Sequence, residues 1–413
     1  MTQKITQKIT KTTSNSRWAV LACFALAAGM SQLLWLNFAP LLSQVEKLYD
    51  VTEARASLLI LVFPLIYVLL SIHAGSLTDR RGYRYTLVAG TLIMAVFSCL
   101  RIYTGSFLIM LAAQIGIAAA QPYVVNSITK LVLDWFAKEH EAMATGLGTM
   151  GMFIGMALGM AITPPLVEAY GLQISMAIFA AAAWLIFFAC LIWVRPNPNS
   201  KHSSSEQIGH GHAVNFSESF SEIIRNSELL FVFFLAFLGL GYFNGLTTWL
   251  EPILAPNGIN SIQAGVAGGV LIAGGIFGSA VIPALSDKMK ARKPLLLLCL
   301  LLSCATIYPL TFSHSYSTVL TFGAVQGFFF LPAFALLLEM CSELAGPKLV
   351  GAATGILMLA GNAGGVIVII AMEWIKGDSP TFVRAVLLLV GVLVVSVATA
   401  IRLRETFSRR ALA

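Results

Sequence analysis

The sequence predicts an all-α membrane protein in which twelve transmembrane helices form two pseudo-symmetric six-helix bundles. Three observations carry this prediction. First, 58% of the 413 residues are hydrophobic and only 11% are charged, whereas soluble domains carry about 25% charged residues. Second, apolar runs of roughly 20 residues, the length that crosses a bilayer as a helix, recur along the whole chain. Third, the two halves of the chain repeat each other at a steady offset.

The apolar runs give twelve expected spans. The first follows a basic cytoplasmic tail, residues 1–17, and is too long for the core of a signal peptide. In the fifth span, Gly151, Gly155 and Gly159 stand four residues apart and predict a close helix crossing. All six cysteines fall inside spans without a metal or disulfide spacing, so no metal site is expected. The expected spans are residues 18–42, 54–76, 83–102, 107–131, 142–166, 173–194, 228–255, 262–286, 294–312, 317–342, 349–373 and 380–402.

One long polar stretch, residues 195–227, divides the chain into an N-terminal bundle, 18–194, and a C-terminal bundle, 228–402. A cytoplasmic tail, 403–413, follows. Apolar residues at helical spacing near the end of this linker predict a short amphipathic helix on the inner membrane face. Its three histidines offer a metal site as an alternative to a solvated linker. The residues concerned are Phe216, Phe220, Ile223 and Ile224, and His202, His210 and His212.

The basic residues predict the orientation of the chain. If the N-terminus is cytoplasmic, 21 of the 26 lysines and arginines lie on the cytoplasmic side. Both termini are therefore expected inside. The short termini and compact loops favour a bacterial inner membrane. The net charge of +7 then reflects orientation, and no nucleic-acid partner is expected.

Two pairs of segments illustrate the internal repeat. LTDRRGYR at 77–84 answers to LSDKMKAR at 285–292, 208 residues later. ATG at 144–146 returns at 353–355, 209 residues later. Parallel repeats of this kind place a solute site between the two halves, near the middle of the membrane.

The stretch GSLTDRRGYRY, residues 75–85 and here called the first loop, concentrates charge between two spans on the expected cytoplasmic side. Its first glycine permits close helix approach and its second a tight turn. Its aspartate suits a helix N-terminus, and its arginines suit nearby carboxylates. The spacing G-x-L-x-D-R-x-G resembles the signature loop of the major facilitator superfamily, which implies that fold and a cytoplasmic gate. A simple inside-anchoring charge cluster is the alternative. The gate residues expected here are Gly75, Asp79, Arg80, Gly82 and Arg84.

The corresponding stretch of the second half, residues 285–293 and here called the second loop, keeps the charge and contains Asp287. Two further pairs of charged residues are related by the repeat: Asp134 with Glu343, and Lys130 with Glu339. The resemblance implies that such residues meet the loop arginines, so all five are expected in the gate. Glu339 is also a candidate for proton coupling, because a carboxylate inside a span is costly and often functional.

Uncharged polar and aromatic residues interrupt several spans near their middle. In this fold, spans one, four, seven and ten usually line the cavity. Trp35 is suited to stack on an ammonium group, and Gln121 to bind a hydroxyl or amine. Hydrogen bonds between helices are the alternative role for each residue. The candidate substrate-binding residues are Gln32, Trp35, Asn37, Gln121, Asn126, Tyr242, Asn244 and Asn362.

Four stretches resemble a narrower family, the feline leukaemia virus subgroup C receptor-related transporters. They are WLNFAPLLSQVEKLYDVT at 35–52, AQPYVVNSITKLVLDWF at 120–136, LGTMGMFIGMALGMAITPP at 147–165 and EMCSELAGP at 339–347. Members of that family move choline and ethanolamine, and haem export has also been attributed to them. The resemblance makes Trp35 the aromatic wall for an ammonium group and Gln121 its polar partner. The chain departs from the family pattern at Asn244 and Asn362.

The function expected is therefore secondary transport of a small organic solute, such as choline or ethanolamine, by alternating access. Export of haem, drugs or another metabolite, and a non-transporting receptor or sensor, remain alternatives. The sequence has no nucleotide-binding loop of the G-x-x-x-x-G-K-[ST] type and no H-E-x-x-H or G-x-S-x-G motif. Neither an enzyme nor a cofactor is expected. The expected partners are the solute and the lipid bilayer, with the protein a monomer.

Overall fold

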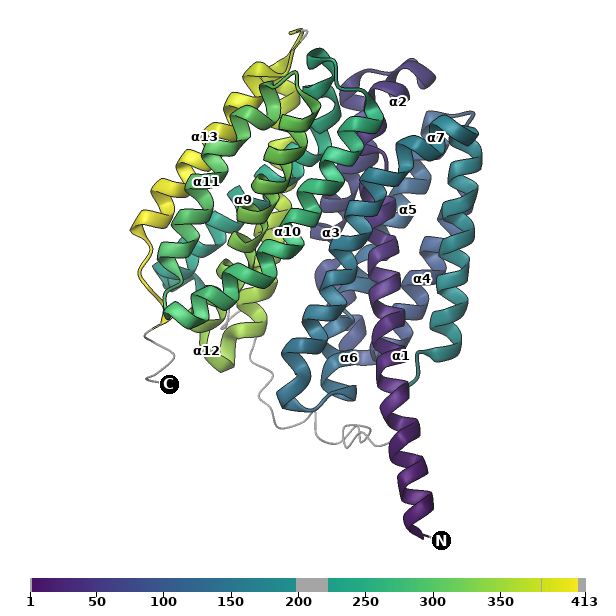
Figure 1. Cartoon of the computed structure of the whole chain (residues 1–413). Helices are drawn as coiled ribbons and strands as arrows, with labels where there is room; N and C mark the ends of the chain where they lie inside the picture. The colour runs from purple at the N-terminus through teal and green to yellow at the C-terminus, as the bar shows by residue number, and fades with distance from the viewer. Residues whose placement is uncertain (1, 198–221, 380, 408–413) are drawn as a thin grey trace. The chain divides into compact units, whose positions relative to one another are not determined.

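The computed structural model describes residues 2–197, 222–379 and 381–407, and of residues 2–15, 142, 347 and 348 only the backbone. All regular elements of the described residues are helical (Figure 1). The short amphipathic helix expected in the linker lies mostly outside them. The elements are α1 Thr2–Leu36, η1 Ala39–Leu41, α2 Leu42–Tyr49, α3 Glu53–Arg81, α4 Tyr83–Leu100, α5 Phe107–Val125, α6 Ile128–Trp135, η2 Lys138–His140, α7 Glu141–Trp193, α9 Ser227–Leu254, η4 Ala255–Asn257, α10 Ser261–Met289, α11 Lys293–Phe312, α12 Tyr316–Lys376 and α13 Val383–Arg402.

Eleven helical segments of the described chain are long and apolar enough to cross a membrane. One of them, 138–193, contains both the fifth and the sixth expected span. Within it, α7 is interrupted at Gly171, whose φ of 78° is not helical. The longest helix, α12, is likewise interrupted at Gly346, with φ 69°. Glycine is favoured at such positions because it reaches positive φ without a steric penalty.

The chain divides into two compact units. Unit 1 comprises, of the described residues, 2–35, 69–156 and 166–197. Unit 2 comprises the remaining described residues, namely 36–68, 157–165, 222–379 and 381–407. Two segments that precede the linker thus pack within unit 2. The bundle boundaries expected from the sequence stay a prediction.

Close helix contacts through glycine shape unit 1. A Cβ atom on Gly155 of α7 would lie 1.9 Å from the carbonyl oxygen of Gly29 in α1. One on Gly151 would lie 2.6 Å from the carbonyl oxygen of Ala25. The glycine spacing therefore marks a true backbone-to-backbone crossing, as the small-residue pattern predicts. Nearby, Phe24 and Leu87 belong to a buried apolar cluster of this unit.

Unit 2 is organised around the long helix α12, which packs against α9, α10, α11 and α13. Here too glycines admit neighbouring backbones. A Cβ atom on Gly327 would lie 1.7 Å from the carbonyl oxygen of Leu271, and one on Gly364 would lie 1.9 Å from that of Phe237.

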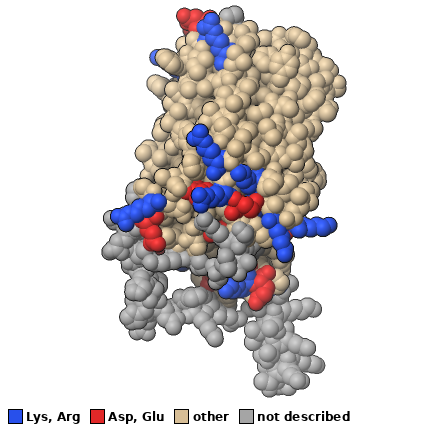
Figure 2. All heavy atoms as spheres, turned by 90° about the vertical axis from the view of Figure 1, so that its left-hand side faces the viewer, with Lys and Arg blue, Asp and Glu red and all other residues tan. Residues whose placement is uncertain are grey.

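In Figure 2 most of the charged side chains in view gather towards one end, and a broad surface without charge lies beyond them.

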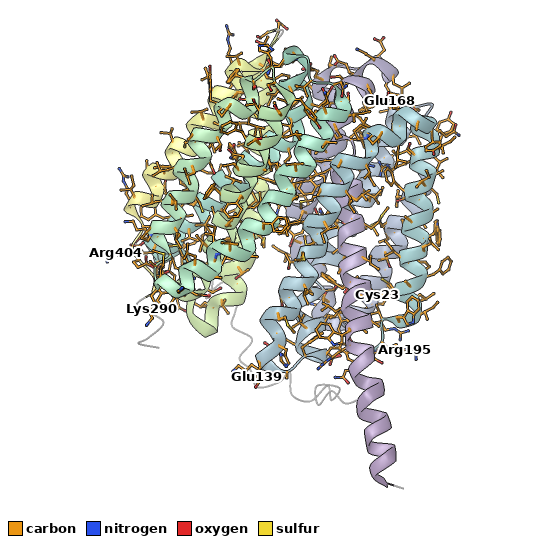
Figure 3. The ribbon with its side chains drawn as sticks, viewed as in Figure 1. Cys23, Glu139, Glu168, Arg195, Lys290 and Arg404 are labelled. Carbon is orange, nitrogen blue, oxygen red and sulfur yellow. The ribbon has the colours of Figure 1, made fainter. Side chains whose placement is uncertain are left out.

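The labelled side chains of Figure 3 mark both ends of unit 1 and one end of unit 2. Glu139 and Arg195 lie at one end of unit 1, and Glu168 lies at the other. Lys290 and Arg404 lie together at one end of unit 2. We call the ends with Glu139 and with Lys290 the predicted inner ends, and the opposite ends the predicted outer ends, because the basic residues predict that orientation.

Candidate functional site

The first loop is held to α6 through its backbone. The Nζ atom of Lys130 donates hydrogen bonds to the carbonyl oxygens of Thr78, at 3.1 Å, and Asp79, at 2.7 Å. Both acceptors belong to the last turn of α3, where the negative end of the helix dipole attracts a cation. Gly82 then turns the chain into α4 with φ 83°. Lys130 therefore contacts the first loop through backbone carbonyl groups and not through the loop arginines that the resemblance implies.

Asp134 lies one turn beyond Lys130 and binds other groups than the loop arginines. Its Oδ2 atom accepts hydrogen bonds from the hydroxyl of Tyr83, at 3.0 Å, and from the backbone N–H of Asn197, at 3.1 Å. The indole N–H of Trp135 donates to the same Tyr83 hydroxyl at 2.6 Å. This network joins α6 to the start of α4 and to the chain after α7, so Asp134 positions the predicted inner end of unit 1.

The charged side chains of the first loop are exposed. Asp79, Arg80 and Arg84 are all exposed, and none of the ion pairs found in the described chain involves them. A Cβ atom on Gly75 would meet no described atom within 4 Å. The close approach expected at Gly75 is thus not made in this conformation, and the gate role of these residues stays a prediction.

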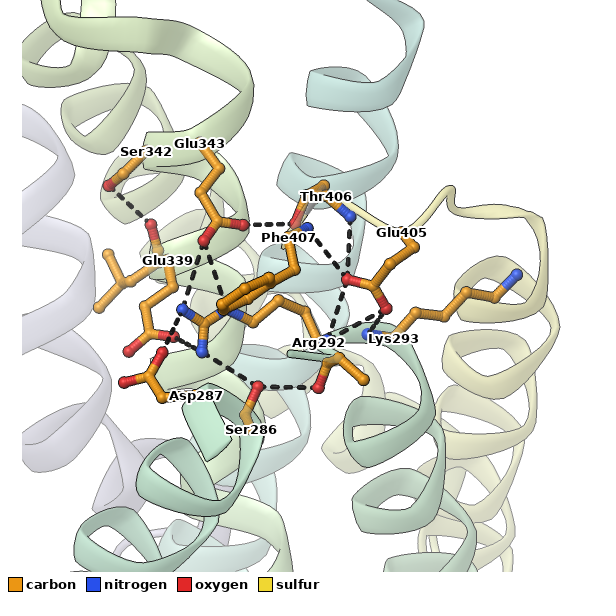
Figure 4. A network of polar contacts seen from close by, with 12 residues as sticks. Ser286, Asp287, Arg292, Lys293, Glu339, Ser342, Glu343, Glu405, Thr406 and Phe407 are labelled. Atoms are coloured by element: carbon orange, nitrogen blue, oxygen red, sulfur yellow. Dashed lines mark hydrogen bonds and ion pairs between the residues drawn. The ribbon is translucent and has the colours of Figure 1, made fainter. Parts of the chain in front are cut away.

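The second loop, in contrast, is locked by one buried arginine (Figure 4). Arg292 is 1% exposed and lies 2.7 Å from Asp287, 2.6 Å from Glu339 and 3.3 Å from Glu343. It also donates a hydrogen bond to the hydroxyl of Ser286 at 3.0 Å. The planar guanidinium suits this arrangement because it offers five N–H donors in a fixed fork. Three predicted gate residues therefore share one cation.

The segment after α13 completes this network. Oxygens of the Glu405 carboxylate accept from the backbone N–H groups of Arg292 and Lys293, at the start of α11, at 3.0 Å each. The hydroxyl of Thr406 donates to Glu343 at 2.6 Å. The ring of Phe407 lies 5.1 Å from the Cζ atom of Arg292, within cation–π range. Residues 405–407 thereby bind the second loop to α12.

The groups of this network shift the pKa values of Glu405 and Arg292. Burial acts to raise the pKa of the Glu405 carboxyl, but four backbone N–H groups, those of Arg292, Lys293, Thr406 and Phe407, together lower it. Burial acts to lower the pKa of Arg292, but the neighbouring carboxylates, Glu339 first among them, raise it overall. Both groups are therefore held in their charged forms.

Three of the four candidate solute residues of unit 1 are buried, Asn126 is partly exposed, and the four differ in their partners. Gln32 is 2% exposed, and its Oε1 atom has no hydrogen-bond partner among the described residues. Trp35, three residues later on α1, is 7% exposed. Gln121 on α5 is 5% exposed, and no hydrogen bond to it is found in the described chain. Asn126, however, donates to the backbone carbonyl of Ser71 at 3.0 Å, so it has a structural role.

The candidate residues of unit 2 fall into two groups. The Tyr242 hydroxyl accepts a hydrogen bond from Gln326 at 2.9 Å, and its ring lies 4.5 Å from that of Phe330. Asn362 donates to the Met358 carbonyl of its own helix. Asn37 and Asn244 are 0% and 2% exposed. The Nδ2 atom of Asn244 is buried without a hydrogen-bond partner in the part of the chain that the structure describes. Tyr242 is thus bound within the unit, whereas Asn244 retains a donor.

Sequence reasoning did not identify several residues of these networks. Glu405 and Phe407 belong to no repeat and to no motif, so the sequence offers no signal for their role. Gln326 lies in the middle of a span, a signal that also applied to Gln121. Glu251, a carboxylate near the end of an apolar run, is 3% exposed. The histidines His202, His210 and His212 lie outside the described residues.

Comparison with protein families gives one match over most of the chain. The model described as Major Facilitator Superfamily matches residues 22–369 and, again, 252–411. Among solved structures, a bacterial homologue of the human lysosomal transporter Spinster, in an inward-facing and unoccupied conformation, has a TM-score of 0.75. The match covers 96% of this chain and 97% of that chain at 15% identity, so it shows the fold.

The curated relatives include uncharacterized proteins and proteins with transporter names. An uncharacterized protein of Archaeoglobus fulgidus is 34% identical over 45% of this chain and 83% of its own length. Solute carrier family 49 member A3 of Danio rerio is 28% identical over 70% of this chain and 62% of its own length. The choline/ethanolamine transporter FLVCR1 of Mus musculus is 24% identical over 88% of this chain and 71% of its own length.

Proposed function

The chain belongs to the major facilitator superfamily, and we propose that this membrane transporter carries choline, ethanolamine or a similar small ammonium compound by alternating access. One of the relatives named above, FLVCR1 of Mus musculus, is a transporter of these two amines. Its low identity leaves the solute to be argued from the residues of this chain.

The observation that carries the proposal is a buried amide oxygen, Gln32 Oε1, that has no hydrogen-bond partner among the described residues and belongs to the residue three positions before Trp35 on α1. Buried polar atoms are almost always hydrogen-bonded. Within the described residues, Gln32 Oε1 has no partner and Gln121 makes no hydrogen bond. An amide oxygen accepts from an ammonium or hydroxyl group, and Trp35 supplies the aromatic face that attracts a quaternary ammonium.

The charge of the spans supports the same class of solute. Spans one, four, seven and ten contain no lysine or arginine between residues 18–36, 107–125, 229–254 and 316–338. A phosphate ester or a dicarboxylate binds most tightly to such cations. A cationic or neutral solute needs none.

Further features of the proposal concern architecture and location. The break at Gly171 divides α7 into two spans, which supports twelve helices in two six-helix bundles. The distribution of lysine and arginine supports cytoplasmic termini. We propose a monomer in a bacterial inner membrane, with the gate at the predicted inner ends.

Glu339 forms an ion pair with Arg292, as a gate residue would, and proton coupling by Glu339 stays a prediction.

The test is uptake of radiolabelled choline and ethanolamine into liposomes containing the purified protein. We expect uptake by the wild type, and a KM raised about tenfold or more in Trp35→Ala and Gln121→Ala, because cation–π contacts and hydrogen bonds to a charged group contribute about 1–3 kcal/mol each. Trp249→Phe is the matched control. The Trp249 side chain is fully buried and donates to the Ile369 carbonyl, so its replacement should lower stability and leave KM unchanged. Uptake of neither amine would exclude this solute class.

A further inference from the structure

Glu251 is a buried carboxylate that the transport site does not use. It lies near the end of α9, at the predicted outer end of unit 2, and is 3% exposed. One oxygen, Oε2, accepts from the backbone N–H of Ser43 at 3.2 Å and from the Ser43 hydroxyl at 2.9 Å. The other, Oε1, accepts from the Ser261 hydroxyl at 3.3 Å. All three donors are neutral.

The same carboxylate lines a cavity of about 510 Å³ within unit 2. This volume lies in the range of sites for small molecules, about 300–1,000 Å³. The cavity is built from the start of α2, the end of α9 and the turn that leads into α10. Its lining residues are Ser43, Gln44, Lys47, Glu251, Ala255, Gly258, Ile259, Asn260 and Ser261.

The charges around the cavity leave Glu251 without a cation of its own among the described residues. Lys47 lines the cavity but is exposed and forms none of the ion pairs found in the described chain. The other lysine near the carboxylates of this end, Lys376, is paired with Glu53. Because a buried charge is normally paired, an unpaired buried carboxylate beside an open volume suits a cationic ligand.

We propose that this cavity is an outer entry site for the ammonium group of the solute, with Glu251 as its counter-ion. A carboxylate offers about four acceptor positions, and the serines fill three, so one N–H donor or the positive face of a quaternary ammonium is accommodated. A bare metal ion fits less well, because hard cations require six or more oxygen ligands held close together. The inference rests on the proposed function for the identity of the solute. The preference of the cavity for a cation rests on Glu251 alone.

The first experiment measures uptake of external choline in cells that express the protein. Glu251→Gln keeps the shape and one acceptor oxygen, which can still accept from Ser43, while its NH2 group can donate to the Ser261 hydroxyl. The substitution removes the charge. We expect its KM for external choline to rise about tenfold, because hydrogen bonds to charged groups contribute about 1.5–3 kcal/mol. Glu251→Asp should retain most of the affinity. Lys47→Ala removes a repelling cation from the cavity, and we expect the KM to fall.

A matched control separates a local effect from surface charge. Glu168 is exposed, lies at the predicted outer end of unit 1 and does not line the cavity. Glu168→Gln therefore removes the same charge and should leave the KM unchanged. An equal rise in Glu168→Gln and Glu251→Gln would overturn the proposal. An unchanged KM for external choline in Glu251→Gln would also overturn it. The same holds if Glu251→Gln changes only the dependence of uptake on pH or sodium.

A second experiment does not depend on transport. Gln44 lines the cavity and is exposed, so Gln44→Cys places a thiol there. We expect a trimethylammonium thiosulfonate to modify it faster than the sulfonate analogue, and this preference to fall several-fold when Glu251→Gln is added. The same reaction with the protein that lacks the Gln44→Cys substitution measures the modification of the native cysteines, which is then subtracted. If neither amine is transported but the preference depends on Glu251, the proposed solute fails and the cationic site stands. If the preference is unaffected, the entry site is refuted even where choline is transported.

Discussion

Replacement of Arg292 by alanine tests whether one buried cation holds the second loop to α12. The side chain is 1% exposed and faces three carboxylates, but these are not equivalent. The side chains of Asp287 and Glu339 are 57% and 35% exposed, so solvent screens these pairs and each contributes at most about 1 kcal/mol. The Glu343 side chain is only 6% exposed. Loss of its partner leaves a buried charge unpaired, which costs about 3–5 kcal/mol.

We therefore expect Arg292→Ala to lower the free energy of unfolding by about 3–5 kcal/mol. The measurement is denaturant unfolding in detergent, with the inactivation half-life as the readout if unfolding is irreversible. Arg404→Ala is the control. Arg404 is 78% exposed and lies 3.5 Å from Glu228, so its loss should cost less than about 1 kcal/mol. Equal effects of the two substitutions, or a loss below about 1 kcal/mol in Arg292→Ala, would refute the reasoning.

Two further predictions concern pH and packing. Because the pKa of Glu405 is lowered from its ordinary value of 4.5, the ionised group stabilises the fold fully above that pH, and this contribution is lost as the pH falls through the lower folded value. Stability of the wild type should thus fall more steeply than that of Glu405→Gln below pH 4.5, and parallel curves would contradict this. Gly155→Leu should prevent assembly of unit 1, since even a Cβ atom would lie 1.9 Å from the Gly29 carbonyl oxygen. A monodisperse, active variant in size-exclusion chromatography would show that α1 and α7 can move apart.

The fold was predictable because its main signals are local in sequence. Apolar runs of the length that spans a bilayer, the repeat offset and the glycine spacing at Gly151 and Gly155 each depend on residues close together in the chain, or on a comparison of the chain with itself. The resemblance of the first loop to the superfamily signature is confirmed by the family match.

The networks were less predictable because their partners are distant in sequence. Glu405 and Arg292 stand 113 residues apart, and no repeat relates them. Ser43 and Glu251 stand 208 residues apart, close to the repeat offset, yet each is an ordinary polar residue at the end of an apolar run. Pairs of this kind depend on how helices pack, which a single sequence does not reveal.

The two loops share a sequence pattern but differ in what holds them. In the first loop, Lys130 binds carbonyl oxygens, and the side chain of Asp79 is left exposed. In the second, Arg292 is buried and shared by three carboxylates. Charges at a protein surface exchange partners at little cost, whereas removing a partner from a buried charge is expensive. The first loop is therefore the part of the predicted gate whose charged side chains can change partners at low cost, whereas the second loop is held within its own unit by a buried cation.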